Sequence, residues 1–220
     1  MPASAAPRSG DFADLVALVA RLRAPDGCPW DRKQTLGDLR AYLLEEAHEL
    51  AAAIDADDWP AIAEELGDLL FEAAFIARLG EEAGALAHPE VVRAAHAKLV
   101  ARHPHVFEGE PLADADSVNR AWERRKAAER SGGQLAGVPT SLPALLAAYR
   151  MTQKAAGVGF DWPDAAAVIA KVREELAEIE AELAAGGAPV RVGEEVGDLL
   201  FAVANLARHL GHDPEAALAR

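Results

Sequence analysis

One eight-residue stretch occurs nearly twice in this chain of 220 residues: EELGDLLF at residues 64–71 and EEVGDLLF at residues 194–201. Seven of the eight positions are identical in the two copies. Each copy holds a glutamate and an aspartate three positions apart, a spacing that makes two side chains neighbours on the surface of a helix. The recurrence of so specific a segment predicts a chain built from two related halves.

A second acidic cluster precedes each copy. It has the form Glu-Glu-x-x-Glu, as EEAHE at residues 45–49 and as EELAE at residues 174–178. Apolar residues surround these clusters at helical spacing, and Glu46 and Asp68 fall on the apolar stripes of their own helices. We therefore expect the acidic side chains to lie against the packed side of two helices rather than on a solvated face.

Helical periodicity continues along the chain, and no segment alternates at a period of two for long enough to suggest a sheet. The expected fold is all-α. The predicted helices span residues 11–23, 36–56, 58–82, 89–103, 117–130, 142–156, 165–185 and 190–210. Thr35, Ser141 and Asp164 precede three of these helices and have side chains suited to an N-cap.

The chain is expected to form two tandem, related helical bundles, of which the second is shortened. Residues 1–10 carry proline, serine and arginine and are predicted to be a disordered start. The first helical domain is assigned to residues 11–130 and the second to residues 142–220. Residues 131–141 between them contain three glycines and form the predicted linker.

The composition excludes several classes of protein. A formal net charge of −14 at pH 7 argues against a nucleic-acid-binding surface, which would be basic. Cys28 is the only cysteine, which excludes an intramolecular disulfide framework and a cysteine-based zinc site. No apolar run is long enough for a membrane span, and residues 1–10 lack the apolar core of a signal peptide. We therefore expect a cytoplasmic protein with no nucleic-acid or membrane partner.

Two helices that both place acids on a packed face would bring four or five carboxylates together. At an effective dielectric constant of about 20, two like charges about 4 Å apart repel each other by about 4 kcal/mol. Protonation or a bound cation relieves that repulsion. Mg²⁺ suits such a site because it binds carboxylates together with the phosphate oxygens of a substrate. The acidic clusters therefore predict a divalent-metal site that serves a phosphate substrate.

Two other interpretations of the acids are weaker. A glutamate run on an alanine-rich helix is usually a solvated face, and Glu64 and Glu194 fit that description. The duplication of the whole arrangement argues against it for the other acids. Glu45 and His48 have the Glu-x-x-His spacing of di-iron carboxylate bundles. That architecture needs a second such pair, and the second half has Ala177 where the histidine would stand.

Basic and aromatic residues after the first acidic repeat fit a phosphate substrate. Lys98 and Arg102 lie one helical turn apart, as do Trp122 and Lys126. By themselves these are ordinary exposed cations and a core tryptophan. Beside a metal site they would supply positive charge for phosphates and an aromatic ring for a base.

As a set, these motifs resemble the MazG family of nucleoside triphosphate pyrophosphohydrolases, which belongs to the all-α NTP pyrophosphatase superfamily. The resemblance covers roughly residues 11–211. Besides the four acidic clusters, it rests on CPWD at residues 28–31, the run from Lys98 to Phe107 with RHPHVF at its end, Trp122-x-x-x-Lys126, and VGFDW at residues 158–162.

The resemblance implies an enzyme that uses Mg²⁺, or Mn²⁺ in its place, to hydrolyse NTPs and dNTPs between the α and β phosphates. The products would be a nucleoside monophosphate and pyrophosphate, and the role would be house-cleaning of nucleotide pools by a homodimer. By motif position, the catalytic acids that hold metal would be Glu46, Glu49, Glu65 and Asp68, with Glu45 in support. The residues that contact substrate would be Lys98, Arg102 and Lys126 for the phosphates and Trp122 for the nucleotide pocket. The metal ligands in the second half would be Glu175, Glu178, Glu195 and Asp198.

The sequence departs from the family in its second half. Family members with two domains commonly continue after the second Glu-x-x-Asp helix with another Lys-x-x-x-Arg helix and another Trp-x-x-x-Lys. This sequence ends at Arg220 with neither, so we expect the working site in the first half. The alternative function is that of a non-catalytic nucleotide-binding or regulatory scaffold of the same fold. A related phosphohydrolase of dUTP, dCTP or a phosphoribosyl-ATP would keep the chemistry and change the base pocket.

Overall fold

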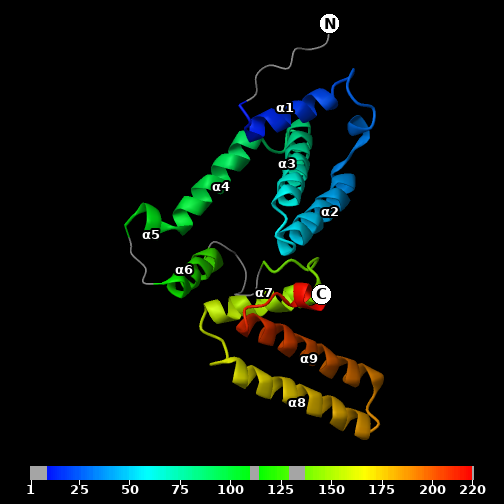
Figure 1. The fold of residues 1–220 in the computed structure, drawn as a ribbon, viewed down its shortest axis with the longest axis vertical. Helices are drawn as coiled ribbons and strands as arrows, with labels where there is room; N and C mark the ends of the chain where they lie inside the picture. The colour runs from blue at the N-terminus through cyan, green and yellow to red at the C-terminus, as the bar shows by residue number, and fades with distance from the viewer. Residues whose placement is uncertain (1–8, 110–113, 129–136, 220) are drawn as a thin grey trace. The chain divides into compact units, whose positions relative to one another are not determined.

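The computed structural model describes residues 9–109, 114–128 and 137–219. Every regular element in these ranges is a helix, which confirms the prediction of an all-α protein (Figure 1). The chain divides into two compact units, Met1–Val100 and Ala101–Arg220. The predicted linker, residues 131–141, lies partly outside the described residues, so the predicted domain limits remain predictions.

The first unit is organised around a pair of long helices. Its elements are α1 (Phe12–Leu22), the 3₁₀ turn η1 (Asp31–Lys33), α2 (Leu36–Asp55), α3 (Trp59–Glu82) and most of α4 (His88–Arg102). Helices α2 and α3 pack side by side, and α1 lies against α3 (Figure 1). These elements fall close to the helices that the sequence predicts.

Side chains at the helix starts explain where these helices begin. Asp11, Thr35 and Asp58 each accept a hydrogen bond from a backbone N–H in the first turn that follows. Thr35 and Asp38 form a reciprocal capping box, which confirms the predicted N-cap and satisfies two backbone donors. Pro60 lies in the first turn of α3, where its missing N–H costs no helical hydrogen bond.

The core of the first unit lies at one end of the α2–α3 pair. Its buried residues are Val16, Val19, Leu39, Ala74, Phe75 and Ala77. Leu39 belongs to the first turns of α2, and Phe75 to the last third of α3. The core therefore forms where α2 begins and α3 ends, and α1 covers it there. At the opposite end of the pair, residues 49–70 are largely exposed.

The second unit contains a similar helix pair. Its elements are α5 (Pro104–Phe107), α6 (Ala115–Ala128), α7 (Ala144–Gly157), α8 (Ala165–Ala184), α9 (Pro189–His209) and α10 (Pro214–Ala219). Helices α8 and α9 pack side by side, α7 lies against α9, and both α6 and α10 contact α7. Asp164 caps α8 as predicted, because its side chain accepts a hydrogen bond from the N–H of Ala167.

One predicted cap is wrong. Ser141 is not the N-cap of α7, because the helix begins at Ala144 and Pro143 occupies the N-cap position without a side-chain hydrogen bond. A proline disfavours the helical conformation of the residue before it, which here is Leu142. The helix therefore begins only after the proline.

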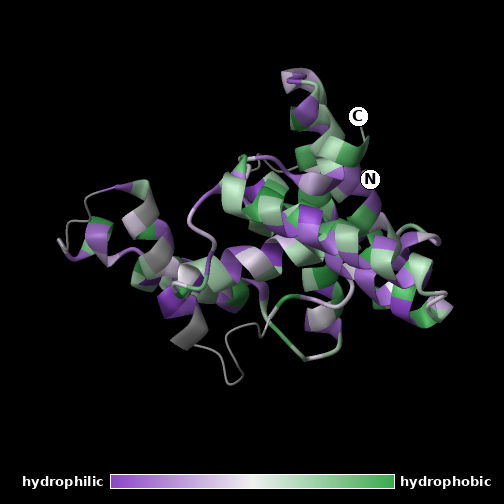
Figure 2. Ribbon diagram, turned by 90° about the horizontal axis from the view of Figure 1, so that it is seen from below, coloured by the Kyte–Doolittle hydropathy of each residue, from purple (hydrophilic) through white to green (hydrophobic). Residues whose placement is uncertain are grey.

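Hydrophilic and hydrophobic residues are interspersed around the helices of the described ranges (Figure 2). Each helix can therefore bury one stripe and leave the other faces to solvent. Throughout the described ranges, no helix has the length and apolar character needed to cross a membrane.

Candidate metal centres

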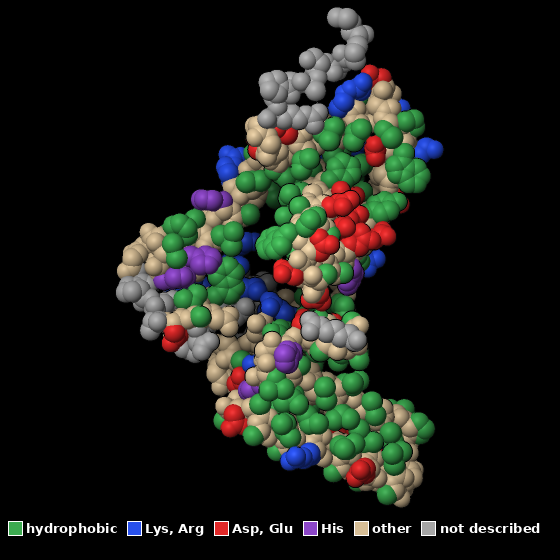
Figure 3. All heavy atoms as spheres, viewed as in Figure 1, with side chains coloured by type: hydrophobic (Ala, Val, Ile, Leu, Met, Phe, Trp, Pro, Cys, Tyr) green, Lys and Arg blue, Asp and Glu red, His purple; other side chains and the backbone are tan. Residues whose placement is uncertain are grey.

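The first acidic site lies between α2 and α3. Because the two helices pack side by side, the Glu-Glu-x-x-Glu motif of α2 meets the Glu-x-x-Asp motif of α3. One carboxylate oxygen from each of Glu46, Glu49 and Glu65 lies within 4.8 Å of the other two. Acidic side chains gather over these two helices (Figure 3). The structure thus brings together three of the four carboxylates that the sequence assigns to metal in this half.

Asp68, the fourth, lies at the solvent side of this cluster. Its side chain and that of Glu49 are exposed, so the expectation that the acids lie against the packed side is wrong for these two. Glu46 and Glu65 are half-buried, whereas the supporting Glu45 is exposed. The reason is the position of the core, which covers only the far end of the helix pair and leaves this part of α3 open.

The electrostatics of the first site favour an added positive charge. Burial, followed by the charges of Asp68 and Glu49, raises the pKa of Glu46. Burial, followed by the charge of Glu49, raises the pKa of Glu65, and a hydrogen bond between these two carboxyls acts in the same direction. Within the described part of the chain, no lysine or arginine forms an ion pair with any of the three clustered glutamates. Only a proton or a bound cation can relieve this repulsion.

Glu72 belongs to this site and was missed by the sequence argument. It lies one turn beyond Asp68 on α3 and is only 8% exposed. Its Oε2 atom has no hydrogen-bond partner among the described residues. Burial, followed by the charges of Glu46 and Asp68, raises the pKa of Glu72. The sequence did contain a signal for Glu72: it lies four residues after Asp68 and three before Phe75, so the three residues share one stripe of the helix.

A cavity of about 260 Å³ opens beside Glu46. Its walls come from η1 and the residues next to it, from α2, and from α3. The lining residues are Trp30, Asp31, Gln34, Leu39, Tyr42, Glu46, Phe71, Glu72 and Phe75. Gln34 is also buried, and its Oε1 atom has no hydrogen-bond partner in the ranges that the structure describes.

The second acidic site lies between α8 and α9. One carboxylate oxygen from each of Glu175, Glu195 and Asp198 lies within 4.8 Å of the other two. Glu175 is buried, Glu195 is half-buried and Asp198 is exposed. Glu178, the remaining predicted ligand, is exposed, and its pKa is raised by burial and then by a hydrogen bond with Glu175.

The second site contains its own cations. The ammonium group of Lys171 lies 2.8 Å from a carboxylate oxygen of Glu174 and 2.7 Å from one of Glu175. Its hydrogen bonds to Glu174 and then Glu175 raise the pKa of Lys171. Arg191 forms a further ion pair with Glu195 at 3.3 Å. Two of the three clustered carboxylates are therefore neutralised from within the chain.

A cavity of about 310 Å³ also opens beside the second site, lined by Trp162, Val168, Lys171, Glu175, Asp198, Phe201, Ala202 and Asn205. Asn205 is buried, and its Oδ1 atom accepts hydrogen bonds from Arg208. These bonds direct the amide nitrogen away from Arg208, and that Nδ2 has no partner among the described residues.

The predicted substrate-binding residues belong to α4 and α6 and not to the helices that carry the acidic clusters. Lys98 is an exposed residue of α4 in the first unit. The guanidinium of Arg102 lies over the ring of Trp122, 5.2 Å from its centroid, and the ring of His103 lies 4.9 Å from the same indole. Lys126 is a half-buried residue of α6. The structure thus joins Arg102 to Trp122, and the roles of these residues toward a substrate remain predictions.

Comparison with known proteins gives a consistent result. Residues 34–107 match the family model described as the MazG nucleotide pyrophosphohydrolase domain, a range that contains all acids of the first site. The chain is 41% identical over 210 residues to a Thermotoga maritima protein named nucleoside triphosphate pyrophosphohydrolase/pyrophosphatase MazG, which covers 94% of this chain and 79% of that protein. It is 40% identical over 210 residues to the Escherichia coli K12 nucleoside triphosphate pyrophosphohydrolase, with 93% of this chain and 80% of that protein covered. An uncharacterized Bacillus subtilis protein, YabN, is 40% identical over 211 residues, which are 94% of this chain and 43% of YabN.

Proposed function

Because this chain belongs to the MazG family of nucleotide pyrophosphohydrolases, we propose that it hydrolyses NTPs and dNTPs between the α and β phosphates. The products are a nucleoside monophosphate and pyrophosphate. The reaction takes place at the acidic site of the first unit and serves to clear unwanted nucleotides from the cell. One observation carries the choice of site: no lysine or arginine among the described residues forms an ion pair with the clustered Glu46, Glu49 or Glu65.

The donor set of this site fits Mg²⁺ or Mn²⁺. Carboxylate oxygens are ligands that both ions accept, and three of them lie within 4.8 Å of one another. Burial, followed by the charges of neighbouring carboxylates, raises the pKa values of Glu46 and Glu65, and a bound cation would offset both effects. Glu46, Glu49, Glu65 and Asp68 would hold the ion, which when bound neutralises phosphate charge and stabilises the leaving pyrophosphate.

The remaining roles belong to the chain itself. Glu45 precedes Glu46 on α2, and its negative charge adds to the attraction of the site for a cation. Lys98, Arg102 and Lys126 bind the phosphates, because the triphosphate carries several negative charges and charge-assisted hydrogen bonds to it are strong. Trp122, which already stacks on Arg102, offers its ring to the nucleotide.

A homodimer is part of the proposal. Large apolar side chains are exposed along the helix pair of the second unit, among them Leu176, Leu183, Val196, Leu200 and Val203. Exposed apolar side chains gathered on one surface are typical of a protein–protein interface. We assign them to contact with a second copy of the chain, and sedimentation equilibrium would measure a dimer mass if this is correct.

The second candidate function is that of a non-catalytic scaffold, and the second unit provides the observation that favours it. Lys171 and Arg191 neutralise two of its three clustered carboxylates, Glu175 and Glu195, so the cluster depends less on a metal ion for its stability. If the first site behaved in the same way, the protein would be a nucleotide-binding scaffold rather than an enzyme.

The deciding experiment measures pyrophosphate release from a panel of NTPs and dNTPs with Mg²⁺, for the wild type, Asp68→Asn and Asp198→Asn. We expect Asp68→Asn to lower the rate by at least about 100-fold, since the loss of even an outer partner of a metal ligand costs 10–100-fold. Asp198→Asn should retain most of the activity. A loss confined to Asp198→Asn would place the working site in the second unit. If neither the wild type nor either variant releases pyrophosphate, the enzymatic proposal is wrong and the scaffold function is favoured.

A further inference from the structure

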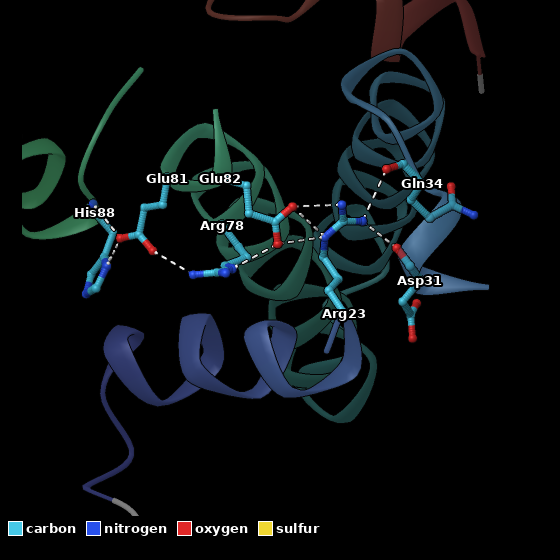
Figure 4. A network of polar contacts seen from close by, with 7 residues as sticks. All are labelled: Arg23, Asp31, Gln34, Arg78, Glu81, Glu82 and His88. Atoms are coloured by element: carbon cyan, nitrogen blue, oxygen red, sulfur yellow. Dashed lines mark hydrogen bonds and ion pairs between the residues drawn. The ribbon is translucent and has the colours of Figure 1, made fainter. Parts of the chain in front are cut away.

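Helix α4 begins without a capping side chain at the residue before it. That residue is Ala87, whose methyl group cannot accept a hydrogen bond from the first turn. Glu81, in the last turn of α3, supplies the acceptor instead (Figure 4). Its Oε1 atom accepts hydrogen bonds from the backbone N–H of His88 at 3.2 Å and from Nδ1 of the His88 ring at 2.6 Å. The start of α4 is therefore fixed by a carboxylate of the preceding helix.

Glu81 belongs to a network that keeps it ionised and in place (Figure 4). Hydrogen bonds from the side chain of His88 and then from its backbone N–H lower the pKa of Glu81. The second carboxylate oxygen lies 3.6 Å from the guanidinium of Arg78, which also pairs with Glu82 at 3.1 Å. Glu82 binds Arg23 at 2.8 Å, and Arg23 donates hydrogen bonds to two backbone carbonyls at η1 and just after it. The network thus joins the start of α4 to α3 and to the segment before α2.

The other supports of α4 in the first unit also lie at its beginning. None of the residues of α4 is buried, and the packing that joins α1 and α2 to α3 does not include this helix. The ring of His88 lies edge-to-face with that of Phe12 in α1, with the centroids 6.4 Å apart. In the preceding turn, Leu86 lies so close to Gly80 that an added methyl group there would be 2.5 Å from its Cγ atom. The contacts around His88 therefore set the direction in which α4 leaves α3.

That direction determines the position of Lys98. Lys98 lies ten residues after His88 on the same helix, which is about 15 Å along the helix axis. A tilt of about 10° at the start of the helix would therefore move Lys98 by about 3 Å. Working sites hold their functional groups to within about 0.5 Å. A loosened start of α4 would thus be enough to displace the lysine.

We propose that Glu81 and His88 are positioning residues of the substrate site, whose contact fixes the direction of α4 and thereby holds Lys98 where the phosphates bind. Neither residue touches the substrate, and both act through the lysine. The negative charge of Glu81 also favours the N-terminus of α4 through the helix dipole, which strengthens the attachment. The inference rests on the proposed function, because that function assigns Lys98 to the phosphates.

Helix α10 of the second unit begins in a different way. By alignment of the acidic motifs, Gly211 stands where the first unit has Glu81. The cap of α10 is local, since the side chain of Asp213 accepts a hydrogen bond from the N–H of Ala216. The sequence of this helix, PEAALA, holds no cation. The cap supplied by a neighbouring helix thus occurs at the helix that carries a proposed phosphate-binding residue.

The first test measures KM and kcat for an NTP with Mg²⁺. Glu81→Ala and His88→Leu should each raise KM about tenfold and leave kcat within about twofold, because a weakened contact to the phosphates affects binding. His88→Asn should stay close to the wild type, since the amide nitrogen of asparagine lies where Nδ1 of histidine lies. His96→Leu is the matched control, because His96 is an exposed histidine of the same helix and its loss should leave KM unchanged.

A double-mutant cycle with Lys98→Ala tests whether Glu81 acts through the lysine. The variant that combines Glu81→Ala with Lys98→Ala should have the same KM as Lys98→Ala alone, because the positioning residue has nothing left to position. Effects that multiply to about 100-fold would overturn the proposal. So would an unchanged KM in Glu81→Ala, or an equal loss in His88→Asn and His88→Leu.

Binding of α,β-methylene-ATP with Mg²⁺, measured by calorimetry on the full chain, separates this proposal from the proposed reaction. This analogue cannot be hydrolysed between its α and β phosphates. If the wild type releases no pyrophosphate, but Glu81→Ala and Lys98→Ala each weaken binding about tenfold and the double variant weakens it no further, the positioning role stands and the proposed reaction fails. Pyrophosphate release with an unchanged KM in Glu81→Ala gives the opposite result. A wild type that neither binds the analogue nor releases pyrophosphate would overturn both.

Discussion

The two helix pairs carry the same acidic motifs and neutralise them in different ways. In the second unit, Lys171 lies within 2.7 Å of the buried Glu175, so the chain supplies a cation where the motif places negative charge. The aligned residue in the first unit is Tyr42, and the site gains an extra buried acid, Glu72, instead. The same motif therefore yields one site in which the protein pairs two of the three clustered carboxylates and one for which we propose a cation from solution. A carboxylate motif alone does not identify a metal site, because the residue one turn before it decides the charge balance.

The largest expected effect comes from a substitution that places a cation in the first acidic site. Tyr42→Lys would place an ammonium group one turn from Glu46, as Lys171 is from Glu175. We expect the Mg²⁺ concentration needed for half-maximal pyrophosphate release to rise about tenfold, which corresponds to about 1.4 kcal/mol of competition for the carboxylate. Titration of activity with Mg²⁺ measures the shift. Tyr42→Met serves as the control, since it keeps an apolar stem at the edge of the core and adds no charge; an equal shift in both variants would assign the effect to packing.

Removal of the internal cation tests the second unit. Lys171→Met leaves Glu175, which is 4% exposed, without its positive partner. We expect the free energy of unfolding to fall by about 1–2 kcal/mol, less than for a fully buried pair because the lysine side chain is 33% exposed. Urea unfolding in EDTA measures the loss, and added Mg²⁺ should recover part of it. Lys33→Met, at an exposed lysine of η1, is the control. Unchanged stability in Lys171→Met would mean that the pair does not balance the cluster.

The pH dependence of stability should differ between the wild type and Glu72→Gln. Because burial and the charge of Glu46 raise the pKa of Glu72, the folded state retains this proton at pH values where the unfolded chain has lost it. The stabilisation is complete below the unfolded value of 4.5 and disappears as the pH rises through the folded value. Without metal, we expect the stability of the wild type relative to Glu72→Gln to decrease from about pH 4.5 upward.

Urea unfolding in EDTA between pH 4.5 and 8 would measure this difference. Glu81 and Glu82 contribute with the opposite sign, because hydrogen bonds from His88 and from Arg23 lower their pKa values. Their contribution is lost as the pH falls below 4.5, and it is common to both proteins, so it cancels in the comparison. A difference that stays constant across the range would show that Glu72 does not hold its proton.

The helices were predictable from the sequence because their signals are local. Apolar spacing and caps such as Thr35 and Asp164 depend on neighbours within one turn, and both caps are confirmed. The exposure of Asp68 was not predictable in this way. Its stripe is apolar, yet whether that stripe is covered depends on where α1 packs, which lies far away in sequence. Glu72 was missed for the same reason. It lies on the same stripe of α3 as Asp68, but one turn further along, where the core begins, and it is therefore buried whereas Asp68 is exposed.

The partners of the acidic residues could be predicted from the sequence only in part. The pairing of Lys171 with Glu175 follows the helical spacing of four residues and could have been found. The hydrogen bonds from Arg23 to the backbone carbonyls of Asp31 and Gln34 could not, because Arg23 lies eight and eleven residues before them and no helical spacing relates the three. Sequence patterns thus located the acidic motifs, and the contacts of the folded chain show which acidic residues have basic partners among the described residues.

The smallest expected effect concerns the helices that carry the two sites. Thr35 caps α2 and Asp164 caps α8, whereas Ser141 forms no cap of α7. Replacement of either working cap by alanine should lower the free energy of unfolding by about 1 kcal/mol, because one backbone donor of the first turn loses its acceptor. Ser141→Ala should change it by less than about 0.5 kcal/mol, as for an ordinary surface position. Urea unfolding of the three variants would show whether α2 and α8 depend on their caps equally. A much larger loss for Asp164→Ala than for Thr35→Ala would mean that the second site is less well supported by its surroundings than the first.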